Sequence, residues 1–277
     1  MKLSTKKILN TVFQVFLFII AFIFLFPAFL TILNSFKPDA VISSNPLSFP
    51  VEFTLDNYIE AWKETRFPRV LFNTFIITVL STTGIILISS MAAYALARSK
   101  WKISWILFLF FTLAMVVPFQ TIMVPLVILA KDLNLIKTAG VLGIVPVYMG
   151  LLCPMAIFMY HGFIKGVPIE MEEAAAIDGA SRFRIFFQIV LPLLGPITAT
   201  IIILDVLWIW NDFLLPLIIL PKQSTIQLAQ FGFFSLFKQE YGKGMASLVL
   251  SASPVVIFYL IMQKFIVKGV TAGSVKG

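Results

Sequence analysis

Ionisable side chains inside long apolar stretches are the residues of this sequence most able to do chemistry. Asp205 and Asp212 lie about two helical turns apart, so on a helix they share one face, with Asn211 beside them. A carboxylate in lipid costs about 2.5 to 3.5 kcal/mol on the insertion scale, so both acids are expected to face protein, water or the membrane interface. Asn211 and Asp212 could line a translocation path, or they could bond to a neighbouring helix or lie at a helix break before Pro216. For Asp205 the sequence favours the structural role.

Other chemically competent residues are sparse. Cys153 is the only cysteine and His161 the only histidine, so the chain can form no internal disulfide and offers no Cys and His set for a metal site. No phosphate-binding loop, dinucleotide-binding fingerprint, zinc-protease motif or nucleophile elbow is present. The sequence therefore predicts that this chain is not an enzyme and binds no metal or cofactor itself.

The elements that position these residues follow from composition. Of the 277 residues 60% are hydrophobic and only 12% are charged, with a mean hydropathy of +0.99, which is too apolar for the surface of a soluble domain. The apolar runs are continuous rather than alternating, so they predict membrane-spanning helices and not a barrel. We expect one all-α integral membrane domain over residues 1–277 with six spans: Thr11–Leu33, Leu71–Ala97, Ile103–Phe119, Gly140–Phe163, Leu193–Leu220 and Ser247–Phe265.

Charge asymmetry predicts the orientation of these spans. With the N-terminus inside, the inner segments carry twelve Lys and Arg against four acids, and the outer segments carry nine against seven. Positively charged segments are retained in the cytoplasm, so both termini are expected there. The net charge of +8 then reflects topology and attraction to anionic lipid, and not a nucleic-acid partner.

A charged stretch, "EEAAAIDGASRFRIFFQIVLPLLGP", lies between the fourth and fifth expected spans. Pro168 suits the first position of a helix, and the glutamates after it place negative charge where the helix dipole favours it. This helix is expected to break at Gly179, which can adopt the left-handed conformation of a C-cap. A second helix should follow, before Pro192 and Pro196 turn the chain back into the membrane. Its apolar residues at helical spacing are Phe183, Phe186, Phe187 and Val190.

Two interpretations of the first helix compete. It could be an amphipathic elbow at the membrane surface. However, Ala174, Ala175 and Ala176 offer little apolar area to lipid and allow another protein to approach closely, while Glu173 and Asp178 flank them. This pattern favours docking into a groove of a soluble partner.

The same residues resemble the "EAA" signature of the permease subunits of ATP-binding-cassette (ABC) importers. In that family the segment is a coupling helix that lies in a cleft of a cytoplasmic ATP-binding subunit. The resemblance implies this role for the cytoplasmic segment 164–192, with contacts from Glu173, Ala174, Ala175, Asp178 and Gly179. The positions that match the signature are Glu173, Ala174, Ala175, Gly179, Ile189, Leu191 and Pro192.

Two further stretches, "FTLDNYIEAW" and "FIVKGVTAGSVKG", are similar to the smaller permease subunit of maltose-type carbohydrate importers. The resemblance implies that the cytoplasmic tail, residues 266–277, lies between two ATPase subunits, although its composition equally suits a frayed terminus. It also implies that Pro221–Ala246 contacts a solute-binding protein. In the first stretch Thr54 can cap a helix on the outer surface. The tail contacts would be Thr271, Ala272, Gly273 and Lys276.

The resemblance implies a permease subunit of an ATP-driven importer for a sugar or oligosaccharide, in a bacterial-type cell membrane. It implies as partners a second, homologous permease in a heterodimer, two cytoplasmic ATP-binding subunits that hold ATP and Mg, and an external solute-binding protein. The alternative from another class is a secondary transporter in which Asp205 or Asp212 carries a proton or sodium ion. A purely structural assembly subunit is a third interpretation.

Overall fold

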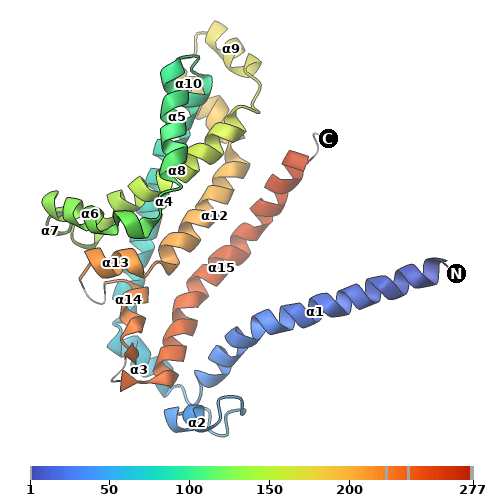
Figure 1. Ribbon diagram of the computed structural model, residues 1–277, viewed down its shortest axis with the longest axis vertical. Helices are drawn as coiled ribbons and strands as arrows, with labels where there is room; N and C mark the ends of the chain where they lie inside the picture. Colours follow the sequence, from blue (N-terminus) through green and yellow to red (C-terminus); the bar gives the residue numbers. More distant parts are fainter. Residues whose placement is uncertain (1, 222–223, 236–237, 275–277) are drawn as a thin grey trace. The chain divides into compact units, whose positions relative to one another are not determined.

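The computed structural model describes residues 2–221, 224–235 and 238–274 and is almost entirely helical (Figure 1). The bounds of the elements are as follows: α1 Lys2–Asn34, α2 Asp39–Ser44, α3 Asp56–Glu64, α4 Phe67–Arg98, α5 Lys102–Ala114, α6 Phe119–Asp132, α7 Leu135–Ala139, a 3-10 turn Gly140–Ile144, α8 Val145–Ile164, α9 Glu170–Ile177, α10 Arg182–Ile185, a π-helical segment Phe186–Val190, α11 Leu191–Leu193, α12 Gly195–Asn211, α13 Leu214–Ile219, α14 Ile226–Phe231 and α15 Tyr241–Ser274. Two short strands, β1 Phe234–Ser235 and β2 Lys238–Gln239, pair antiparallel.

Four helices of the described chain are long and apolar enough to cross a membrane. Two further pairs of helices pass the same test together but are bent, by 103° for α5 with α6 and by 74° for residues 182–193 with α12. The described residues therefore hold four candidate spans, or up to six if each bent pair counts as one. The four unbroken spans are Leu9–Asn34, Phe67–Arg98, Leu135–Ile164 and Tyr241–Phe265.

The third expected span, Ile103–Phe119, ends earlier than the sequence indicated. Helix α5 stops at Ala114 after 13 residues, which at about 1.5 Å per residue is shorter than the hydrocarbon core of a bilayer. Pro118 explains the early end, because proline disfavours helical backbone at the residue before it. The chain then turns by 103° into α6, for which Pro118 is the N-cap residue.

The fifth expected span, Leu193–Leu220, is also interrupted. Helix α12 ends at Asn211, Asp212 is extended, and the short helix α13 begins at Leu214. Proline has no backbone N–H to donate, so Pro216 could not sit in the interior of one continuous helix without a kink or break. In α13 it occupies the first turn, where the missing donor costs least.

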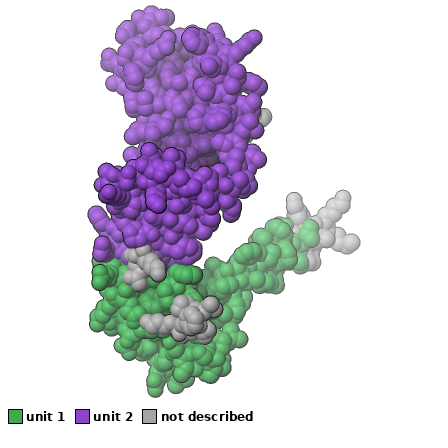
Figure 2. Space-filling model, turned by 60° about the vertical axis from the view of Figure 1, so that its left-hand side comes forward, with its two compact units in different colours: residues 1–68, 229–253 green, residues 69–228, 254–277 purple. Residues whose placement is uncertain are grey.

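The structure divides into two compact units (Figure 2): residues 69–228 with 254–277, and residues 1–68 with 229–253. In the larger unit, residues 69–228 with 254–277, α4, α8 and α12 share a core in which Ile85, Ile144 and Tyr160 are fully buried. The Tyr160 hydroxyl donates to Thr198 Oγ1 at 2.9 Å and joins α8 to α12. Ser89 Oγ donates to the Cys153 carbonyl at 3.4 Å and joins α4 to α8. These three helices form the framework that carries both candidate sites.

The smaller unit contains the expected helix after Thr54. Thr54 Oγ1 accepts a hydrogen bond from the Asp56 backbone N–H at 3.0 Å, but the N-cap residue of α3 is Leu55, so Thr54 lies one residue before the capping position expected from the sequence. The same helix meets the start of α15 through Lys243, whose Nζ lies 2.8 Å from Glu60, 2.6 Å from Glu64 and 2.9 Å from Glu240. These contacts join the start of α15 to α3.

Candidate functional site

Helix α9 and its end carry the charged, alanine-rich segment. The helix begins at Glu170, so Pro168 lies before it rather than at its first position. At the other end Gly179 has a φ of +84°. Its N–H donates to the Ala176 carbonyl at 3.1 Å, and the Ala180 N–H donates to the Ala175 carbonyl at 3.0 Å. This pair of bonds is a Schellman C-cap, and it confirms the helix break expected at Gly179.

The face of α9 that points away from the protein core is exposed. Glu173, Ala174, Asp178 and Gly179 are exposed, whereas Ala175 is half-buried against the core. Ile177 is 87% exposed in the described chain. The signature does not single out Ile177, because this residue lies between the fixed positions. A charged and apolar surface on one short helix can bind the groove of another protein.

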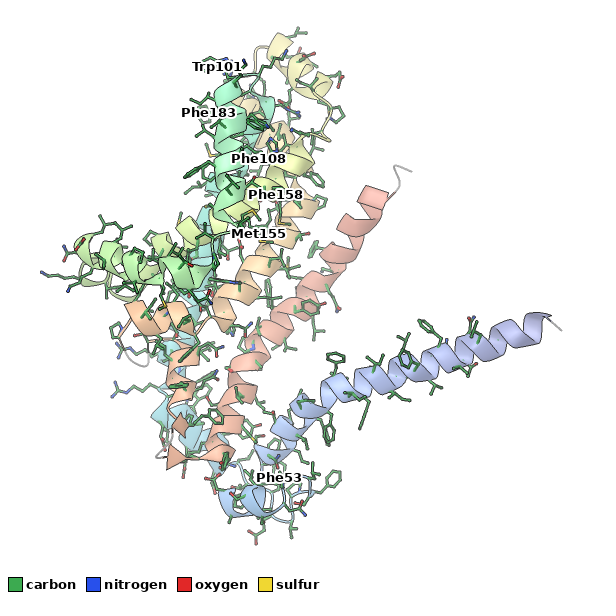
Figure 3. All side chains as sticks on the ribbon, viewed as in Figure 1. Phe53, Trp101, Phe108, Met155, Phe158 and Phe183 are labelled. Atoms are coloured by element: carbon green, nitrogen blue, oxygen red, sulfur yellow. The ribbon has the colours of Figure 1, made fainter. Side chains whose placement is uncertain are left out.

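The second helix of the segment is built differently from the expectation. Ser181 caps α10, accepting a hydrogen bond from the Arg184 N–H at 3.3 Å. Phe186 and Val190 are buried, whereas Phe183 is 68% exposed and Phe187 43% exposed, so the protein itself covers only two of the four apolar residues. The π-helical turn after Ile185 adds a residue to the turn and changes which side chains point inward. Figure 3 labels Phe183 in α10 and Trp101 just before α5, both exposed.

A buried ion pair fastens α9 to α4. Glu172 is only 8% exposed, and its Oε1 lies 2.7 Å from a guanidinium nitrogen of Arg98. The Tyr94 hydroxyl donates to Glu172 Oε2 at 2.8 Å. The sequence placed Glu172 only as a charge near the helix N-terminus, and it gave no sign of Arg98 or Tyr94, because these partners precede it by more than seventy residues.

Asp212 forms the junction between α12 and α13. Its Oδ1 accepts hydrogen bonds from the backbone N–H groups of Leu214 at 3.0 Å and Leu215 at 3.4 Å. Its Oδ2 accepts one from the Tyr148 hydroxyl at 3.1 Å. Asn211 is exposed and donates to the Leu207 carbonyl of its own helix at 2.8 Å. Asp212 therefore caps the first turn of α13, and the Asn211 side chain beside it is exposed.

Other ionisable residues in the spans lie apart from these two places. Asp205 is 7% exposed, and its Oδ2 has no hydrogen-bond partner in the described part of the chain. His161 stacks on Phe108 with ring centroids 3.8 Å apart, where α5 packs on α8 beside Phe158 (Figure 3). No three His, Cys, Asp or Glu side chains meet as a metal site among the described residues.

The expected tail contacts fall at the end of α15. Thr271, Ala272 and Gly273 belong to that helix, but their side chains are outside the described part of the structure. Lys276 lies outside the described residues altogether. The tail contact stays a prediction.

Comparison with known proteins places these features in context. A family model described as the inner membrane component of binding-protein-dependent transport systems matches residues 84–272, which include α4 from Gly84 onward, α9 and the α12–α13 junction. The probable permease protein AmyC of the transport system for starch degradation products, from Thermoanaerobacterium thermosulfurigenes, is 40% identical over 99% of both chains. The permease protein MsmG of a multiple sugar-binding transport system, from Streptococcus mutans, is 37% identical over 91% of this chain and 92% of its own.

The fold has a solved counterpart. A chain of a bacterial ABC transporter involved in the import of the acidic polysaccharide alginate superposes with a TM-score of 0.79. The match covers 94% of this chain and 97% of the other, at 22% sequence identity. This likeness concerns the fold alone. It shows that a chain with the same arrangement of helices occurs in a membrane transporter.

Proposed function

This chain belongs to the family of inner membrane components of binding-protein-dependent transport systems, and on that premise we propose that it is a permease subunit of an ATP-driven sugar importer. The relatives named above are permeases and not enzymes. In the proposed assembly the chain forms half of a translocation pathway with a second, homologous permease. Two cytoplasmic ATP-binding subunits hold ATP and Mg, and a solute-binding protein delivers the substrate from outside.

The observation that carries this proposal is the exposed face of α9 that points away from the protein core. A chain with no phosphate-binding loop in its sequence must obtain the free energy of ATP through contact with another protein. The Schellman cap fixes the end of α9. The exposed residues there are Glu173, Ala174, Asp178 and Gly179, and Ala175 packs against the core. In the proposed mechanism this helix binds a cleft of the ATP-binding subunit and passes its closure to the spans.

The substrate class is proposed from the relatives. AmyC is named for starch degradation products and MsmG for multiple sugars. The Bacillus subtilis permease MelC, which is 35% identical over 91% of both chains, is named for melibiose, raffinose and stachyose. We accordingly assign a sugar or oligosaccharide to this chain. Asn211 and Asp212 are the candidate residues of the path, since Asn211 is exposed beside the helix break that Asp212 caps.

The proposed topology places both termini and α9 on the cytoplasmic side of a bacterial-type inner membrane. Charge asymmetry supports it: Lys and Arg flank α9 and the chain ends, while the acids concentrate in the segments assigned to the outside. In this orientation α3 and the outer loop 221–246 face the solute-binding protein. The Lys243 cluster with Glu60, Glu64 and Glu240 then braces that outer region.

The proposed function is tested by purifying the chain from its native membrane in mild detergent, with every stoichiometric companion identified and ATPase activity assayed. We expect an ATP-binding subunit and a second permease to co-purify. Ile177→Asp should lower recovery of the ATP-binding subunit roughly tenfold or more, because burial of a large apolar side chain stabilises a contact by about 1.5 to 3 kcal/mol. The second permease should remain.

The matched control is Leu133→Asp. Leu133 follows the end of α6, is 59% exposed and, like Ile177, is an aliphatic residue next to an aspartate. It should leave recovery of both companions unchanged. Recovery of the chain alone, with uptake that follows an ion gradient and not ATP, would contradict the proposal. It would make the protein a secondary transporter and direct attention to Asp205 and Asp212.

A further inference from the structure

Glu172 is set apart from the other acids of α9. Glu170, Glu173 and Asp178 are exposed, whereas the Glu172 side chain retains only 9% of its accessible surface. Both of its carboxylate oxygens are bonded: Oε1 to Arg98 and Oε2 to Tyr94. An acid that faces inward cannot be part of the surface that binds a partner. Its role must therefore lie within the chain.

Arg98 is the last residue of α4 and makes more than one contact to the segment. Its Nε donates to Glu172 Oε1 at 2.9 Å, and a terminal nitrogen donates to the Val167 carbonyl at 2.9 Å. One guanidinium thus holds both the chain that enters α9 and the first turn of α9. Removing one partner of a largely buried ion pair leaves the other charge unpaired, which is destabilising, so these contacts hold the two segments together.

Tyr94 lies one helical turn earlier in α4 and reaches the other end of the segment. Its hydroxyl bonds to Glu172, and its ring packs against Phe186 with centroids 5.2 Å apart. Phe186 is 3% exposed and begins the π-helical segment that follows α10. The last two turns of α4 therefore contact the chain both before and after the Gly179 break.

We propose that Tyr94, Arg98 and Glu172 form a clamp that transmits movement of α9 to α4. The inference rests on the proposed function, in which α9 binds the ATP-binding subunit. Helix α9 has eight residues and is joined to α8 and α10 by loops, which alone would absorb a displacement. The clamp replaces that slack by direct bonds to a span of 32 residues. All three are positioning residues, and none of them touches substrate or nucleotide.

The test follows α4 directly and needs no knowledge of the sugar. In a Cys153→Ala background, Leu87→Cys places a fluorescent label on α4, where Leu87 is 43% exposed. The whole complex is purified, and the change in label fluorescence on adding a non-hydrolysable ATP analogue with Mg²⁺ is recorded. The amount of bound ATP-binding subunit is measured in the same samples, so a loss of assembly is separated from a loss of transmission.

We expect Arg98→Gln and Glu172→Gln to reduce the fluorescence change about fivefold or more, the scale of an ordinary coupling between sites, while the ATP-binding subunit stays bound. The double variant should be no worse than Arg98→Gln alone, since both changes break the Arg98–Glu172 contact and only Arg98→Gln also removes the bond to the Val167 carbonyl. Tyr94→Phe removes one hydroxyl without a change of charge or volume and should give a smaller loss. It keeps the test valid if a charge variant fails to assemble.

Two controls match the charge variants. Glu170→Gln neutralises an exposed acid in the first turn of α9, and Lys100→Gln neutralises an exposed base just past α4; both should keep the full fluorescence change. An unchanged signal in Glu172→Gln and Tyr94→Phe, with the ATP-binding subunit bound, would overturn the clamp. Additive losses in the double variant would do the same. Failure of the proposed function looks different, because the unsubstituted complex would then bind no ATP-binding subunit.

Discussion

Gly179→Pro is expected to leave the protein in the membrane and to abolish coupling between ATP hydrolysis and uptake. Proline cannot adopt the φ of +84° found at this position, and it lacks the N–H that bonds to the Ala176 carbonyl. The change should cost about 3 kcal/mol or more locally, which corresponds to roughly a hundredfold weaker docking of a rigid α9. Binding of the ATP-binding subunit to variant membranes measures docking, and uptake by whole cells measures transport.

A series at Gly179 separates backbone geometry from contact with the partner. A β-carbon added at Gly179 would meet no other atom of the described chain within 4 Å, so Ala costs only the left-handed conformation, about 1 to 2 kcal/mol, and Asn less. If geometry decides, coupling should fall in the order Gly, Asn, Ala, Pro. If Asn is as damaging as Pro, the partner surface excludes a bulky side chain. Normal uptake by Gly179→Pro would sink the coupling-helix assignment.

Local sequence signals predicted where α9 ends, but they did not predict the contacts that hold α9 against α4. Gly179 could be recognised as a C-cap because its backbone requirement is set by its own neighbours. The Glu172 clamp could not, because Arg98 and Tyr94 are distant in sequence and nothing in hydropathy or helical spacing pairs them. Pro118 ends the third expected span, and its effect was underestimated against a continuous apolar run. The bend at Pro118 thus has a local cause in the sequence, whereas the contacts of Glu172 depend on packing that the local sequence does not encode.

The candidate path shows the same division. The sequence identified Asp212 as costly in the membrane and left open a path or a helix break before Pro216, and the structure places it at that break. The Tyr148 partner was not foreseen, since it lies on another helix. Asp205 was expected to be structural, and it is buried. We propose that the path runs past Asn211 and Asp212 on the side of the α12–α13 junction opposite these hydrogen bonds.

Substitutions at Asp212 are expected to separate its capping contact from a role in transport. Asp212→Ala removes the acceptor of two backbone N–H groups and of the Tyr148 hydroxyl, so the complex should lose about 2 to 3 kcal/mol of stability. Asp212→Asn keeps an oxygen for the cap and should cost about 1 kcal/mol or less, because Asn and Asp cap equally well. Thermal unfolding of the purified complex measures both.

The same two variants, together with Asn211→Ala at the other candidate path residue, decide the role in transport. Asn211 bonds only to its own helix among the contacts of the described chain, so its removal should leave stability intact and reveal any effect on uptake. We expect Asp212→Asn to slow uptake without releasing the ATPase activity, since the cap persists while the negative charge beside the path is gone. If Asp212→Asn instead prevents assembly, or if uptake stays normal in both Asp212→Asn and Asn211→Ala, the junction has a structural task only and the path must be sought on other helices.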